Sequence, residues 1–118
     1  MEKRNFKVIP ESINIGGVKI DVLNVIRCDD NNLGNCCVAE SKIEIADVCD
    51  KDRNQSEESK RNTFYHELVH CILDTMGEGE LSKNEKFVCV FSSFLNEAMQ
   101  KAIFIDDVNM SDLQTPVR

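Results

Sequence analysis

The chain has 118 residues and a net charge of −7. This length predicts one domain with a single core, spanning residues 1–118. An acidic chain without a clustered basic patch is a poor partner for nucleic acid, because phosphate neutralisation supplies most non-specific affinity. No stretch approaches the roughly 18 apolar residues of a membrane span, and no apolar leader follows Met1, so we expect no membrane insertion and a cytoplasmic location. In that compartment the six cysteines should be reduced thiols, most of them small core residues.

The first part of the chain predicts β-structure. Residues 6–9 predict a short strand that ends at Pro10. Residues 13–26 predict a hairpin, because two runs rich in β-branched residues flank the turn pair Gly16-Gly17. An antiparallel or mixed sheet is therefore expected at the N-terminal side.

A polar loop and two more strands follow. Residues 29–35 predict the loop, with Gly34 as its turn residue. Residues 36–40 and 42–46 predict strands, and the second alternates apolar and polar side chains, which indicates one buried and one exposed face.

Two helices are predicted in the second half, so the fold class is α+β. The first should start near Ser56, since Glu57 and Glu58 suit the positive end of a helix dipole, and end near Met76 before Gly77. Its apolar residues recur at helical spacing and include Phe64, Leu68, Ile72 and Met76. The second should run from Ser82 to about Ala102 and bury Phe87, Val88, Phe91, Phe94, Leu95 and Ala98.

The first helix contains the most informative motif, His66-Glu67-Leu68-Val69-His70, which has the form HExxH. Residues four apart share a helix face, about 6 Å apart along the axis. Two imidazoles so placed can bind one Zn²⁺, and Glu67 can act as general base on the water that the metal activates. The motif therefore predicts zinc-dependent hydrolysis, most readily of a peptide bond.

A catalytic zinc usually has three protein ligands, and the chain has no third histidine. Asp74 lies too far along the helix to be a ligand, although it could hydrogen-bond to His70. A hairpin of two helices would bring Glu85 beside the histidines, so Glu85 is our preferred ligand. Glu85 is also the last residue of a possible capping box that begins at Ser82. The alternatives are Glu78, Glu80 and a cysteine such as Cys89.

Residues 63–73, followed by residues 84–88, resemble the small gluzincin metallopeptidases, especially the compact phage and prophage enzymes and the ImmA/IrrE-type peptidases. The resemblance implies a small zincin-like domain in which His66, His70 and Glu85 bind zinc and Glu67 is the catalytic base. It also implies that residues 42–47 form an edge strand to which a peptide or protein substrate adds as a further strand. Tyr65 faces the apolar side of the helix and is expected in the core.

Two functions compete on these grounds. The first is a small cytoplasmic zinc endopeptidase. The second is a zinc-binding protein without turnover, acting as an interaction module or as a decoy of phage type. Glu67 favours the first, because a purely structural zinc site needs no base between its ligands and would close its fourth position with a protein thiolate.

Overall fold

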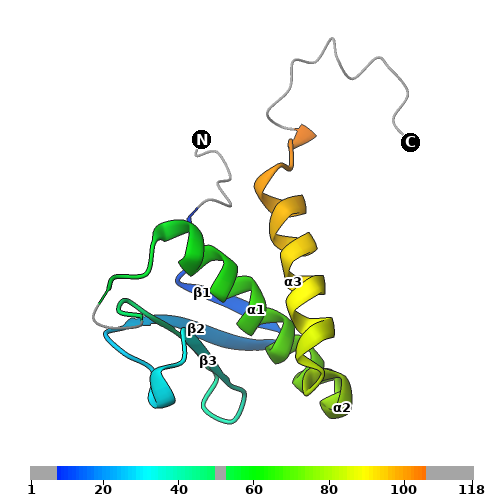
Figure 1. Cartoon of the computed structure of the whole chain (residues 1–118). Coiled ribbons are helices and arrows are strands. Elements are labelled where there is room, and N and C mark those ends of the chain that lie inside the picture. The colour runs from blue at the N-terminus through cyan, green and yellow to red at the C-terminus, as the bar shows by residue number, and fades with distance from the viewer. Residues whose placement is uncertain (1–7, 50–52, 106–118) are drawn as a thin grey trace.

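A computed structural model describes residues 8–49 and 53–105, which form an α+β fold (Figure 1). Four strands come first, and three helices follow: β1 (Ser12–Ile15), β2 (Val18–Val25), β3 (Gly34–Cys37), β4 (Lys42–Ala46), α1 (Glu57–Met76), α2 (Gly79–Ser82) and α3 (Glu85–Gln100). Between β2 and β3 lies one short 3-10 turn, Asp29–Asn31. Within the described ranges, no helix combines the length and the apolar character that a membrane crossing requires.

The strands form one mixed sheet in the order β1-β2-β4-β3. The β1–β2 and β3–β4 pairs are antiparallel, whereas β2 and β4 are parallel. Strand β4 is therefore interior, and the expectation that residues 42–47 form an edge strand is wrong. Its backbone already pairs with neighbours on both sides and has no free edge for a peptide.

Helix α1 lies between the sheet and α3 (Figure 1). On its sheet side Phe64, Tyr65 and Cys71 pack with Ile20, Ile43 and Ile45 in one buried cluster. On its other side Val69 and Leu73 pack with Val88 of α3 in a second cluster. Because both broad faces of α1 are covered, His66 and His70 are left on the narrow flank between them. The expectation that Tyr65 is a core residue is confirmed, since only 5% of it is exposed.

The ends of α1 agree with the expectation from sequence. The Ser56 hydroxyl accepts a hydrogen bond from the amide of Ser59 at 3.1 Å, and Gly77 ends the helix with a φ of 82°. Next to the cap, the buried side chain of Gln55 binds the carbonyl of Ala46 in β4 at 2.6 Å. Its Oε1 accepts hydrogen bonds from Ser59 and Thr63 at 2.8 and 2.7 Å. Gln55 thus fixes the start of α1 on the sheet.

Gly34 is the first residue of β3, so its expected role as a loop turn residue is wrong. A Cβ at this position would lie 2.5 Å from Cγ2 of Thr63 and 3.1 Å from Cγ of Glu67, both on α1. Glycine is required here because strand and helix approach each other closely. The strand also ends at Cys37, short of the expected Glu40.

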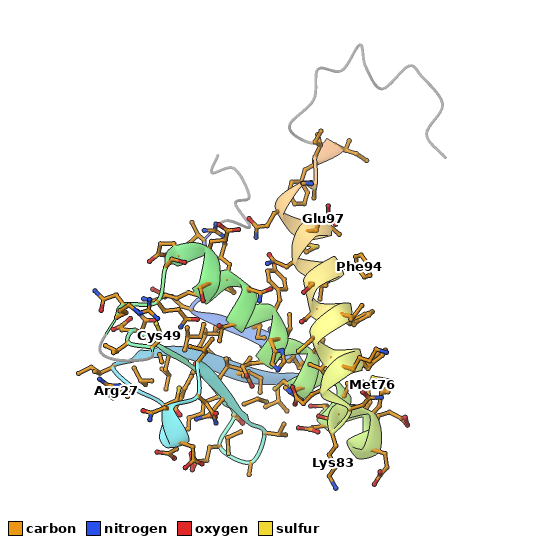
Figure 2. All side chains as sticks on the ribbon, in the orientation of Figure 1. Arg27, Cys49, Met76, Lys83, Phe94 and Glu97 are labelled. Carbon is orange, nitrogen blue, oxygen red and sulfur yellow. The ribbon has the colours of Figure 1, made fainter. Side chains whose placement is uncertain are left out.

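The second long helix differs most from expectation. Its N-cap is Asn84, whose side chain accepts a hydrogen bond from the amide of Phe87 at 3.1 Å, so neither the helix start at Ser82 nor the capping box with Glu85 is correct. Val88 and Ser92 are its buried residues. Phe91 and Phe94 are 48% and 67% exposed, and Phe94 points away from α1 (Figure 2). The apolar spacing correctly indicated a helix but overestimated how much of it is covered.

Three smaller expectations were also wrong or only partly right. Met76 is 66% exposed at the end of α1. Val8 and Ile9 are not in a strand, while the remainder of the strand expected at residues 6–9 lies outside the described residues. All six cysteines fall in the described part and are free thiols, but only Cys28 and Cys71 are buried.

Candidate metal centre

His66 and His70 lie one turn apart on the flank of α1, as the motif predicts. Their Nε2 atoms are 3.2 Å apart, and their rings meet edge to face with centroids separated by 4.9 Å. Both side chains are partly buried, because the sheet and α3 cover the neighbouring positions of the helix. The two nitrogens therefore converge on one point at the surface of the helix.

Glu85 reaches the same point from the first residue of α3. The short helix α2 reverses the chain, so that the start of α3 returns beside α1. One carboxylate oxygen of Glu85 lies 3.3 Å from Nε2 of His66, and the other lies 3.1 Å from Nε2 of His70. The three residues form a group that could hold a metal ion.

The spacing of these atoms fits a small tetrahedral ion. Ligands placed 2.0–2.1 Å from a tetrahedral zinc lie about 3.3 Å from one another. The two Nε2 atoms are 3.2 Å apart, which is close to that edge length, and each lies 3.1–3.3 Å from a different oxygen of the Glu85 carboxylate. With one of these oxygens as the ligand, the three ligand atoms all lie within 4.8 Å of one another. The three side chains therefore already lie around one position that a metal ion could occupy.

The alternative ligands do not join this group in the described part of the chain. Glu78 and Glu80 are exposed in the α1–α3 connection. Cys89 places its Sγ 3.8 Å from Nδ1 of His66, on the opposite side of the ring from the metal position. Asp74 lines the cleft one turn beyond His70. Of the residues considered as third ligand, Glu85 is the one that lies with His66 and His70 in a group that could hold a metal ion.

Ser82 makes a contact with the ligand group that the sequence did not predict. Its hydroxyl lies 3.0 Å from Nδ1 of His70, in the position that was considered for Asp74. Ser82 is only 6% exposed, although it ends a four-residue helix. Serine and asparagine are about equally good N-caps, so the sequence does not decide between Ser82 and Asn84. Identifying Asn84 as the cap would have left Ser82 free for another role.

Glu67 is buried beside the ligand group, with 9% of its surface exposed. Burial, and then the negative charge of Glu85, raise the pKa of its carboxyl group to about 7. Burial and the neighbouring His70 lower the pKa of His66, against an opposing effect of Glu85. A neutral imidazole is the form that binds metal, so the environment of His66 favours coordination.

A cleft of about 530 Å³ opens over these residues. On one side it is lined by α1, with Asn62, Thr63, His66, Glu67 and His70, and on the other by residues 32–36, which lead into β3. Glu85 and Asp74 complete its lining. The cleft therefore joins the ligand group, Glu67 and one edge strand in a single space.

In comparisons with known proteins, no family model, no curated protein and no solved structure matches the chain. The case for a metal at His66, His70 and Glu85 therefore comes from the positions of these side chains alone.

Proposed function

We propose that the protein is a zinc-dependent peptidase with a zincin-like site, in which His66, His70 and Glu85 bind the metal and Glu67 is the general base. The observation that carries this proposal is the convergence of two imidazole nitrogens, 3.2 Å apart, on the Glu85 carboxylate at 3.1–3.3 Å, in the same cleft as a buried glutamate. Two imidazoles and one carboxylate suit zinc, and a site with three protein ligands leaves its fourth position for water. Such an open position is typical of catalytic sites and not of structural ones.

Zinc, when bound, would act as a Lewis acid that lowers the pKa of water and polarises the substrate carbonyl. Glu67 would take the proton of the attacking water and later deliver it to the leaving amine. A carboxyl group buried beside the metal position can serve both steps, because it can accept a proton and then release it. Asn35 and Asn62 line the same cleft and offer amide donors for the substrate.

The peptide substrate would lie along β3 and not along β4. Strand β3 is an edge of the sheet, and only its β4 side is paired within the described residues. Its first residues line the cleft, so a peptide added there as a further strand would pass in front of His66, Glu67 and Glu85. The described residues that line this cleft include three carboxylates and no lysine or arginine, which favours a neutral or basic peptide segment.

A zinc-binding interaction or decoy protein without turnover is the second candidate. The observation in its favour is the exposed apolar face of α3, which carries Val90, Phe91 and Phe94 with 49%, 48% and 67% exposure. Exposed apolar groups of this size are common at protein-binding surfaces. Only the peptidase requires the carboxylate of Glu67, so replacing this residue distinguishes the two candidates.

The test combines metal analysis with a cleavage assay on an unfolded, fluorescently labelled protein. Wild-type protein should contain one zinc per chain and cleave the substrate. Glu67→Gln should keep zinc and lose cleavage, because an amide cannot accept the proton of water. Glu58→Gln, an exposed change on the same helix, should keep both.

Undiminished stoichiometric zinc in His66→Ala would contradict the metal site. Cleavage by Glu67→Gln at the wild-type rate would exclude Glu67 as the base. Zinc binding by wild type without any cleavage would favour the interaction protein.

A further inference from the structure

We propose that Ser82 is a positioning residue of the metal site, which accepts a hydrogen bond from Nδ1–H of His70 and so keeps Nε2 of that imidazole free for the metal. The inference rests on the proposed zinc site and adds to it a residue outside the HExxH motif. The deciding contact is the 3.0 Å distance between Oγ of Ser82 and Nδ1 of His70.

The need for such a contact follows from the chemistry of imidazole. A neutral imidazole carries its proton on one ring nitrogen, and only the other nitrogen can bind a metal. Nε2 of His70 faces Nε2 of His66 and the Glu85 carboxylate, so metal binding there requires the proton on Nδ1. An N–H in this partly buried position needs an acceptor, and the Ser82 hydroxyl is placed to be one.

The backbone holds Ser82 in place for this role. Its amide donates to the carbonyl of Glu78 at 2.9 Å, which fixes the residue within α2. Glu85 follows three residues later, so the turn that delivers the third ligand also delivers the hydroxyl behind His70. Two parts of the site therefore come from one short segment, residues 82–85.

His66 provides a comparison within the same site. Its Nδ1 lies 3.8 Å from Sγ of Cys89, which is an exposed thiol. Sulfur is a weak acceptor, and water can replace it at an exposed position. Loss of the Cys89 side chain should therefore weaken metal binding less than loss of the Ser82 hydroxyl.

The test measures Zn²⁺ affinity by competition with a chelating dye, using folded full-length protein. Loss of a partner that orients a metal-binding histidine typically lowers affinity about 10–100-fold, and we expect this range for Ser82→Ala. Ser82→Thr keeps a hydroxyl and should restore most of the affinity. Ser92→Ala is the matched control, because Ser92 is 2% exposed and its hydroxyl binds the carbonyl of Cys89 and not an imidazole.

A second measurement separates orientation of the ring from general loosening of the fold. In zinc-loaded protein with ¹⁵N-labelled histidine, the Nδ1 proton of His70 should be visible and slow to exchange with water. In Ser82→Ala the same proton should exchange faster, while that of His66 should be unchanged.

Ser82→Ala with wild-type zinc affinity would overturn the proposal, and so would an equal loss of affinity in Ser92→Ala. Either result would contradict only the role of Ser82 and not the proposed zinc site. A folded wild-type protein that binds no zinc would instead overturn the proposed function together with this inference.

Discussion

Gly34 in the edge strand lies directly against Thr63 of the HExxH helix: a Cβ on Gly34 would lie 2.5 Å from Cγ2 of Thr63. The contact lies on the wall of the cleft, next to Glu67. The strand β3 and the helix α1 can therefore lie this close together because Gly34 has no Cβ.

The first prediction is that Gly34→Ala lowers the free energy of unfolding by about 1–3 kcal/mol, the usual cost of forcing an extra carbon into a packed position. Thr63→Ser removes Cγ2 but keeps the hydroxyl that binds Gln55. The double variant should therefore recover part of the loss, as measured by urea unfolding. If the double variant is as unstable as the sum of the two single ones, the clash lies elsewhere.

A second prediction separates two neighbouring residues at the start of α3. Asn84→Ala removes the cap and should cost about 0.5–2 kcal/mol of stability while zinc affinity stays close to wild type. Glu85→Ala should greatly weaken zinc binding and cost the metal-free protein at most about 1 kcal/mol through the helix dipole.

Zinc titration and thermal melting in the presence of a chelator measure the two effects independently. Glu80→Ala is the control, since Glu80 is exposed and outside the ligand group. Glu85→Ala with unchanged zinc affinity would remove the third ligand from the site.

The third prediction concerns pH and the metal-free protein. Burial and Glu85 raise the pKa of Glu67 from its ordinary value of 4.5 to about 7. Below pH 4.5 the carboxyl is protonated in both the folded and the unfolded chain. As the pH rises from 4.5 to 7, the unfolded chain loses this proton first, so the free energy of unfolding falls. Above pH 7 the free energy of unfolding is about 3 kcal/mol lower than it is below pH 4.5.

Urea unfolding in a chelating buffer at several pH values measures this loss. The amide in Glu67→Gln cannot titrate. The free energy of unfolding of the variant should therefore increase relative to that of wild type as the pH rises. A difference that is constant between pH 5 and pH 8 would contradict the raised pKa.

The fourth prediction concerns Gln55, which joins the start of α1 to β4. Gln55→Ala removes its bonds to Ala46, Ser59 and Thr63 and leaves buried polar atoms without those partners. The expected cost is about 2–4 kcal/mol of unfolding free energy. Asn54→Ala, an exposed change at the preceding residue, is the control. A loss below about 1 kcal/mol would mean that water replaces these bonds.

Local features of the fold were predictable from sequence because local chemistry determines them. The cap at Ser56, the glycine at position 77 and the turn at Gly16-Gly17 each follow from the conformation of a few residues. The spacing of His66 and His70 follows from helix geometry alone.

The features that could not be predicted depend on contacts between distant parts of the chain. Alternation in residues 42–46 indicates a strand with two unlike faces, but it does not say whether that strand is interior or at an edge. The spacing of Phe91 and Phe94 indicates an apolar helix face, but not whether another element covers it. Ser82 could not be assigned, because the partner of its hydroxyl is twelve residues away in sequence.

The position of the three ligands on two helices has a consequence for the motions of the protein. A metal held by His66, His70 and Glu85 would act as a cross-link that closes the α1–α3 connection into a small loop. Such a closure restricts local opening, and α3 buries only Val88 and Ser92 along its sixteen residues. Amide hydrogens in α3 should therefore exchange with solvent more slowly once the metal is bound, whereas those in β2, which lies between β1 and β4 and carries no ligand, should change little.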